Sequence, residues 1–177
     1  MKILIASDIH GDKQSCQRVL EIFEERGAEW LLLLGDLLYH GPRNPIPAHY
    51  DPGEVARLLG EHKEHILCVR GNCDGEVDQM MLPFPILSET AMLLVDGRVW
   101  MAAHGHRKGA NPTEDDLPYL PEGSVFLSGH THIPTDDLDP NGIRRINPGS
   151  VTFPKGDSRK SCVLYADGEF ESIDLFP

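Results

Sequence analysis

The chain has 177 residues, a length typical of one domain that buries most of the surface its unfolded form exposes. With 40% hydrophobic and 25% charged residues, its composition is that of an ordinary water-soluble globular protein. The formal net charge of -12 argues against a broad nucleic-acid-binding surface, because such surfaces need clustered lysines and arginines. No apolar stretch approaches the ~20 residues of a membrane-spanning helix, and the N-terminal apolar run is too short for a signal peptide. We therefore expect a single domain, residues 1–177, that is cytoplasmic and has no membrane segment.

The four cysteines show no CxxC pair and no repeated spacing; they are Cys16, Cys68, Cys73 and Cys162. We therefore expect free thiols in a reducing compartment and no disulfide framework. Cys16 and Cys162 lie in apolar patterns and are expected in the core.

The first half of the chain predicts alternating strands and helices. The apolar run 2–6 ends in a polar loop, as a buried parallel strand does. A helix follows, since apolar residues recur at helical spacing from Cys16 to Phe23 and Gly27 stands in the position of a C-terminal cap. A second strand at 30–36, a helix that begins at Asp51 and Pro52, and a third strand within 65–74 complete the pattern. The order β-α-β-α-β predicts parallel strands with right-handed crossovers.

The second half predicts mostly short strands. Two apolar runs flank Asp96-Gly97, which is a strong signal for a β-hairpin. Further strands are expected within 124–132, 139–151 and 161–176, and a short turn is expected near 111–117. We interpret the chain as an α/β protein, a four-layer α/β/β/α sandwich of two mixed sheets flanked by helices.

Polar residues with metal-binding side chains follow five of the predicted strands. The five stretches are Asp8-x-His10, Gly35-Asp36, Gly71-Asn72-Cys73-Asp74, His104-Gly105-His106 and Gly129-His130-Thr131-His132. In open α/β sheets ligands bind at the carboxyl ends of the strands, so these loops are expected to converge. Each stretch alone is weak evidence, because Gly-Asp is a common turn and a lone histidine is more often a satisfied side chain than a ligand. Five such stretches after five apolar strands indicate a metal-dependent active site.

In this order, the five stretches resemble the motifs of the calcineurin-like metallophosphoesterase superfamily. Those motifs are D-x-H, G-D, G-N-H-[DE], a histidine in a G-H or H-G-H context, and G-H-x-H. The further stretches HGPRN (40–44), RGNCD (70–74) and INPGSV (146–151) are similar to those of the small bacterial phosphodiesterases of the YfcE type. The resemblance covers essentially the whole chain. It implies the metallophosphoesterase fold and a phosphodiesterase that acts on a small-molecule phosphodiester.

The resemblance also implies a set of metal ligands. Two divalent ions about 3.5–4 Å apart would share the carboxylate of Asp36. The first ion would also bind Asp8, His10 and His132, and the second would also bind Asn72, His104 and His130. Oxygen and imidazole ligands without thiolate suit Mn²⁺ as the first choice, with Fe²⁺, Zn²⁺ or Ni²⁺ as alternatives. A hydroxide bridging the two ions would attack phosphorus in line with the leaving oxygen, with Asp36, Asn72 and His104 as the catalytic residues.

Cys73 departs from the family pattern, because most members have a histidine there that is thought to protonate the leaving alkoxide. A thiol is a weak hydrogen-bond donor and carries no positive charge. We interpret Cys73 as a residue that fills space or supports the ligands, which leaves open what protonates the leaving group. Other candidates for substrate binding or ligand support are Asp74, His40, Arg43, Asn44 and His106.

Two other functions compete with hydrolysis of a small phosphodiester. The same fold occurs in a retromer subunit known chiefly as a protein-interaction scaffold, with vestigial metal binding, and that relative also lacks the histidine at the position of Cys73. A scaffold has little use for a complete set of seven ligands, so the set favours the enzyme. A nuclease is disfavoured by the acidic composition. The sequence does not identify the substrate or the metal, and it leaves open whether the chain forms a homo-oligomer.

Overall fold

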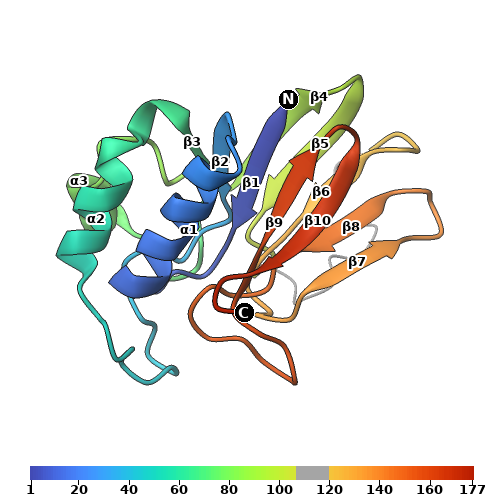
Figure 1. Cartoon of the computed structure of the whole chain (residues 1–177). Helices are drawn as coiled ribbons and strands as arrows, with labels where there is room; N and C mark the ends of the chain where they lie inside the picture. Colours follow the sequence, from blue (N-terminus) through green and yellow to red (C-terminus); the bar gives the residue numbers. More distant parts are fainter. Residues whose placement is uncertain (107–119) are drawn as a thin grey trace.

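The computed structural model describes residues 1–106 and 120–177, and it contains two five-stranded sheets. Figure 1 shows the helices α1 and α2 gathered beside one sheet, with the strands of the second sheet on the opposite side. This arrangement confirms the predicted pair of mixed sheets. The turn predicted near residues 111–117 lies outside the described residues.

The first sheet has the strand order β10-β9-β1-β2-β3. Its strands are β1 (Lys2–Ala6), β2 (Trp30–Leu33), β3 (Ile66–Cys68), β9 (Ser161–Ala166) and β10 (Glu169–Asp174). As predicted, β1, β2 and β3 are parallel, whereas β9 and β10 are antiparallel to their neighbours. Because β1, β2 and β3 are parallel, their carboxyl ends meet at one edge of the sheet.

The two long helices connect the parallel strands: α1 (Lys13–Glu25) follows β1, and α2 (Pro52–Glu61) follows β2. The carboxylate of Asp12 caps α1 by accepting hydrogen bonds from two backbone N–H groups of the first turn, at 3.0 and 3.1 Å. The helix stops before the predicted Gly27, whose φ of 61° permits a Schellman turn in which the N–H of Ala28 donates to the carbonyl of Phe23. Two short helices, η1 (Lys63–His65) and α3 (Glu76–Met81), occur where the sequence predicts none.

The second sheet has the strand order β4-β5-β6-β8-β7. Its strands are β4 (Thr90–Val95), β5 (Arg98–Ala103), β6 (Val125–Leu127), β7 (Thr135–Leu138) and β8 (Arg144–Asn147). β4 and β5 form the predicted hairpin, and Asp96 and Gly97 both have positive φ, of 47° and 78°, as a two-residue type I′ turn requires. β5, β6 and β8 are parallel, so the loops after β5 and β6 also leave from one edge of their sheet.

Alternate residues of β1 belong to two separate hydrophobic clusters. Leu4 and Ala6 pack in one cluster with residues of α1 and α2, and Ile3 and Ile5 pack in the other with Trp100 of the second sheet. Because successive side chains of a strand point to opposite faces, one continuous apolar run supplies both clusters. In the described part of the chain, the helices thus cover the first sheet and the second sheet packs against its other face.

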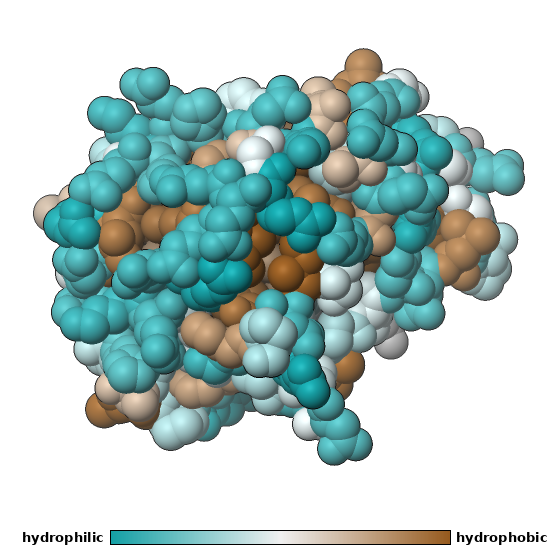
Figure 2. Space-filling model, viewed as in Figure 1, coloured by the Kyte–Doolittle hydropathy of each residue, from teal (hydrophilic) through white to brown (hydrophobic). Residues whose placement is uncertain are grey.

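The face of the molecule in Figure 2 is mostly hydrophilic, and hydrophobic residues are visible mainly in the recesses between hydrophilic ones and at a few edges. This surface agrees with the charged composition of the chain. Among the described residues, no helix is both long and apolar enough to cross a membrane.

Candidate metal centre

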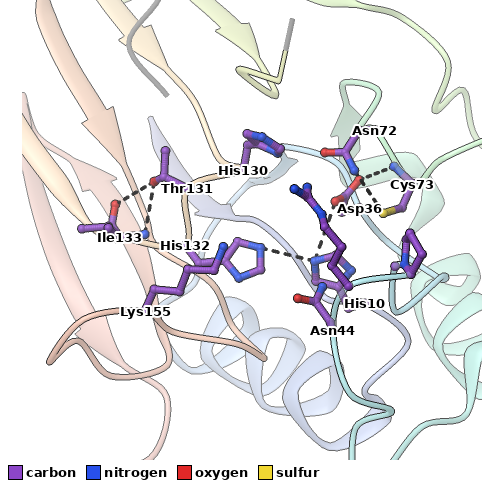
Figure 3. Close-up of a pocket in the computed structure, with 13 residues that line it drawn as sticks. His10, Asp36, Asn44, Asn72, Cys73, His130, Thr131, His132, Ile133 and Lys155 are labelled. Atoms are coloured by element: carbon purple, nitrogen blue, oxygen red, sulfur yellow. Dashed lines mark hydrogen bonds and ion pairs between the residues drawn. The ribbon is translucent and has the colours of Figure 1, made fainter. Parts of the chain in front are cut away.

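The loops after β1, β2, β3 and β6 converge on one pocket with a volume of about 510 Å³. Figure 3 shows the side chains of His10, Asp36, Asn72, His130 and His132 arranged around this pocket. The loop after β5 reaches the same place, because its His104 contacts Asn72. The structure therefore brings together all five of the stretches that the sequence singles out.

Asp8, His10 and His132 form a first group of potential ligands. Asp8 Oδ1 lies 3.1 Å from His132 Nε2 and 3.5 Å from His10 Nε2, and the two imidazole nitrogens are 3.4 Å apart. All three side chains are almost completely buried. Together with Asp36, they are the residues predicted for the first metal.

Asp36 connects this first group to a second one. Its Oδ2 lies 3.7 Å from His10 Nε2 and 3.5 Å from His104 Nε2, and the latter atom is 3.2 Å from Asn72 Oδ1. One carboxylate oxygen thus lies between imidazoles that the sequence predicts for different metals, which agrees with the predicted sharing of Asp36. Asp8 Oδ1 is 3.9 Å from His104 Nε2, so both aspartates border both groups.

His130 lies at the edge of the second group. Its ring centroid is 5.1 Å from that of His104, and its backbone N–H donates a hydrogen bond to Asp8 Oδ2 at 3.1 Å. Burial and the neighbouring His104 lower the pKa of His130 to about 4, so its imidazole is neutral at neutral pH. A neutral imidazole is the form that binds a metal.

Backbone carbonyls fix the tautomers of the other three histidines. Nδ1 of His10 donates to the carbonyl of Tyr39 at 2.9 Å. In the same way Nδ1 of His104 donates to Leu34 at 2.6 Å, and Nδ1 of His132 donates to Phe153 at 2.7 Å. A neutral imidazole that donates from Nδ1 has its lone pair on Nε2, which here points toward the carboxylates. Metal-binding histidines in proteins are held in this way.

The converging lone pairs leave a place for a cation. Asp8 Oδ1 is buried and has no hydrogen-bond partner, although Nε2 atoms of His10, His104 and His132 lie within 3.9 Å of it. A carboxylate oxygen and nitrogen lone pairs repel each other in a buried site unless a positive charge lies between them. The oxygen and imidazole donors therefore fit a divalent transition metal.

The close approach of carboxylates and imidazoles also shifts the pKa values of these groups. Burial opposes protonation of His104, but hydrogen bonding to Asp36 and the charges of Asp8 and Asp36 outweigh it and raise the pKa of His104 to about 9. Without a metal, a proton on His104 Nε2 would therefore supply the positive charge that the carboxylates attract, and a bound metal would displace it. Burial would raise the pKa of Asp8, yet its histidine neighbours lower it well below the usual range. The carboxylates thus remain ionised and attract positive charge to the centre of the group.

The backbone at the potential ligands is strained. Within the described ranges 1–106 and 120–177, non-glycine residues with positive φ include Asp8, His10, Asp36, His130 and His132, with φ between 49° and 64°. The others, Asp96 and Asp167, each precede a glycine in a hairpin turn. A left-handed conformation costs about 1–3 kcal/mol for each such residue and is typical of functional sites. The concentration of strain at five of the seven predicted ligands supports their assignment.

Two glycines allow loops to approach the ligands closely. A Cβ atom at Gly71 would overlap with the carboxylate and the backbone nitrogen of Asp36, and a Cβ atom at Gly129 would overlap with Ser7 Oγ, next to Asp8. The motifs G-N-C-D and G-H-T-H therefore need their glycines for steric reasons.

Asp74 supports the loop that carries Asp36. Its carboxylate accepts hydrogen bonds from the backbone N–H groups of Asp36, Leu37 and Gly71 at 2.8, 2.9 and 2.7 Å. Burial raises the pKa of Asp74, and these backbone N–H groups partly offset the effect. Asp74 does not line the pocket, so its role is to hold Asp36 in place.

Cys73 lines the pocket, and its backbone N–H donates to Asp36 Oδ1 at 2.7 Å. Its thiol accepts a hydrogen bond from Asn72 Nδ2 at 3.2 Å. Burial, and then the charge of Asp36, raise the pKa of the Cys73 thiol, which is therefore neutral at neutral pH. This environment agrees with the interpretation of Cys73 as a supporting residue rather than a thiolate nucleophile.

The other predicted candidates fall into two sets. Arg43 and Asn44 line the pocket, and Asn44 Nδ2 donates to the carbonyl of His40 at 2.8 Å. His40 does not line it; its ring packs between Tyr39 and Tyr50. His106 does not line it either, and its ring centroid is 5.5 Å from that of His104.

Four residues that support or extend the site are not predicted from the sequence; they are Ser150, Thr152, Ile133 and Lys155. Ser150 Oγ donates to the carbonyl of Asp8 at 3.0 Å, and Thr152 Oγ1 donates to that of Ile9 at 2.7 Å, so the segment after β8 holds the D-x-H loop. Ser150 belongs to the stretch INPGSV (146–151), which contains no charged residue, histidine or cysteine that would indicate a role in the site. Ile133 and Lys155, which line the pocket, lie just beyond the recognised motifs.

Comparisons with known proteins extend these observations. The family model of the calcineurin-like phosphoesterase superfamily domain matches residues 1–169. The chain is 46% identical over 156 residues to the phosphodiesterase YfcE of Escherichia coli K12, a match that covers 88% of this chain and 82% of that protein. The structure of YfcE, a phosphoesterase from E. coli, is similar with a TM-score of 0.93 and 41% identity, over 99% of this chain and 94% of that one. Wild-type Vps29 of Entamoeba histolytica complexed with Zn²⁺ shares the fold, with a TM-score of 0.59 and 17% identity over 99% of each chain.

Proposed function

Because the chain belongs to the calcineurin-like phosphoesterase superfamily, we propose that it hydrolyses a small-molecule phosphodiester with two divalent metal ions. The chain is an enzyme of the phosphoric diester hydrolase class. One observation carries the proposal: the buried Asp8 Oδ1 has no hydrogen-bond partner and faces Nε2 atoms of three histidines. A metal is the group that this arrangement fits.

The residues divide between two ions that share Asp36. Asp8, His10, Asp36 and His132 would hold the first ion, and Asp36, Asn72, His104 and His130 would hold the second. We favour Mn²⁺ for this mixture of oxygen and imidazole donors. When bound, the ions supply Lewis acidity and an activated water for attack on phosphorus in line with the leaving oxygen.

Neither Cys73 nor His130 offers a strong acid for the leaving group. The thiol of Cys73 is a weak donor, and His130 with its pKa of about 4 carries no proton to give at neutral pH. Catalysis should then depend on leaving groups that depart as stable anions, such as aryl oxides. We propose aryl-like or otherwise activated diesters as the most reactive substrates.

The pocket supports a small substrate. Its volume of about 510 Å³ is within the range of small-molecule sites, about 300–1,000 Å³. Arg43 and Asn44 on one wall would contact the substrate next to the metals. A diester also carries one negative charge fewer than a monoester, which suits a chain of net charge -12.

The test is hydrolysis of bis(4-nitrophenyl) phosphate by protein loaded with Mn²⁺. Asp36→Asn and His104→Ala should each abolish turnover while the circular dichroism spectrum stays unchanged, because the ligands lie at strand ends and not in the hydrophobic core. His49→Ala, at an exposed histidine outside the site, serves as the matched control and should keep full activity. Near wild-type turnover in either ligand variant under saturating metal would show that the site is wrongly assigned.

A scaffold without catalysis is the alternative function. Vps29 shares the fold, but at 17% identity this likeness says nothing of activity. The complete set of ligands and the strained backbone that presents them favour the enzyme.

A further inference from the structure

Lys155 lines the pocket and comes from a different loop than Arg43, the other basic residue among those that line it. Arg43 belongs to the loop after β2, whereas Lys155 lies before β9, beside the loop after β6 that carries His132 and Ile133. Figure 3 shows the side chain of Lys155 next to His132, on the side of the pocket away from Asn72 and Cys73. No motif recognised in the sequence contains Lys155.

The backbone at Lys155 is fixed to a metal ligand. Its N–H donates to the carbonyl of His132 at 3.1 Å, and two residues earlier the carbonyl of Phe153 accepts from His132 Nδ1 at 2.7 Å. The ring of Phe153 stacks on that of His132 with an angle of 7° between the planes. The hydrogen bonds to His132 therefore hold the backbone of Lys155 in a fixed position relative to His132.

The ammonium group lies at the rim of the pocket rather than on its floor. Lys155 is exposed, whereas His10, Asp36 and His132 on the floor are 1%, 2% and 3% exposed. A solvated cation at the rim does not take the place of a buried metal ion, and it could contact a part of a substrate that extends out of the pocket.

Lys155 also forms no ion pair with the carboxylates of the described residues. Seven arginines do form such pairs; they are Arg18, Arg26, Arg57, Arg70, Arg144, Arg145 and Arg159. In a chain with 28 acidic and 16 basic residues, a lysine at the pocket without an acidic partner in the described structure is available for an anion of the substrate.

We propose that Lys155 determines specificity by binding a second anionic group of the substrate, on the arm of the diester that remains after the leaving group departs. The substrate class is then a phosphodiester that carries an additional carboxylate or phosphate. This inference rests on the proposed phosphodiesterase function and adds the substrate class to it. Ile133, exposed beside Lys155 in the same pocket, supplies an apolar surface for the carbon atoms of that arm.

A matched pair of diesters tests the inference: 4-nitrophenyl phenyl phosphate and 4-carboxyphenyl 4-nitrophenyl phosphate. Both release 4-nitrophenolate, so they differ only in the carboxylate on the retained arm. The wild-type enzyme should have the higher kcat/KM for the carboxylated diester, and Lys155→Met should lower the ratio of the two values about two- to fivefold, the range of one solvent-exposed ion pair. Lys155→Arg should keep most of the preference. A third diester with a phosphonate instead of the carboxylate shows whether a monoanion or a dianion binds better.

The control variant is Lys63→Met, which removes an exposed lysine before the amino end of β3, whereas the pocket lies beyond the carboxyl end of that strand, so the ratio should stay unchanged. The wild-type preference should also fall toward one as salt rises to about 1 M, where the Debye length is only ~3 Å. The dissociation constants of diphenylphosphinate and its 4-carboxy derivative, measured by calorimetry, give a readout independent of turnover because their P–C bonds are not hydrolysed.

Two failures are distinguishable. If neither diester is hydrolysed under saturating metal, the proposed function is wrong, and the phosphinates still test the binding of the anion. In the second failure, both diesters are hydrolysed, but the preference for the carboxylated diester is the same in the wild type and in Lys155→Met. An equal preference of the two proteins for the carboxylated phosphinate would have the same meaning. Either result overturns the assignment of Lys155.

Discussion

Gly71 illustrates how closely the loops approach each other at the metal centre. Any side chain there would overlap with the carboxylate and backbone nitrogen of Asp36, the residue shared by both groups of ligands. Gly71→Ala should therefore displace Asp36 and weaken metal binding by at least about tenfold, which corresponds to ~1.4 kcal/mol. Calorimetric titration of metal-free protein with Mn²⁺ measures this loss.

Gly53 is the matched control for that substitution. It lies in the first turn of α2, and its nearest neighbour to an added Cβ is Asp51 Oδ1 at 3.8 Å, which is ordinary contact. Gly53→Ala should leave Mn²⁺ affinity unchanged and stabilise the helix by about 0.5–1 kcal/mol. Wild-type Mn²⁺ affinity in Gly71→Ala would mean that Asp36 is not held in the position that metal binding needs.

Cys73 stands at the position where the resemblance to the family implies a histidine that protonates the leaving group. A neutral thiol is a poor acid, so the rate of the wild-type enzyme should depend steeply on the pKa of the leaving group. Cys73→His introduces an acid with a pKa near 6.5 and should flatten this dependence, raising the rates of poor leaving groups by up to about 10²–10⁴-fold if the imidazole reaches the leaving oxygen. A series of aryl diesters measures the slope.

Cys73→Ser provides the comparison for that series. A hydroxyl of similar size should change the slope little, because the thiol of the wild type is not expected to act in the chemistry. A loss of several orders of magnitude in Cys73→Ser would instead show that the thiol itself takes part in the reaction.

At the scale of single elements, α1 depends on its N-terminal cap, Asp12. Asp12 is 3% exposed, accepts two N–H groups of the first turn, and lies 3.6 Å from the ammonium of Lys160. Asp12→Ala should destabilise the protein by about 1–2 kcal/mol, more than Asp51→Ala at the more exposed cap of α2, where one N–H is accepted. Urea denaturation of both variants measures the difference, and equal losses would contradict the argument from burial.

The elements that the sequence predicts well are those with an apolar pattern or a strong turn. The helix containing Cys16 and Phe23, the parallel strands and the hairpin at Asp96-Gly97 all occur as expected. The sequence does not predict the helix α3, which has only six residues and buries none of them; its apolar residues Val77 and Met80 are 73% and 86% exposed. An apolar pattern of less than two helical turns is too short to predict a helix, because windows of about 11–18 residues are needed.

At the scale of the whole molecule, two sheets bring together residues from position 8 to position 155 of the chain. The ligand types could be predicted because each follows an apolar strand, and the parallel order of β1, β2 and β3 places their ends at one edge. The support from Ser150 and Thr152, and the place of Lys155 on the pocket wall, could not be predicted. They depend on how the second sheet packs on the first, and short polar stretches carry no signal for that packing.

The number of metal ions bound per chain tests the central claim most directly. Protein freed of metal, loaded with excess Mn²⁺ and separated from unbound ion should contain two ions per chain by elemental analysis. The proposed division of the ligands into two groups that share Asp36, whose Oδ2 lies 3.7 Å from His10 Nε2 and 3.5 Å from His104 Nε2, predicts this number. Saturation at one ion per chain, or no binding, would contradict the account.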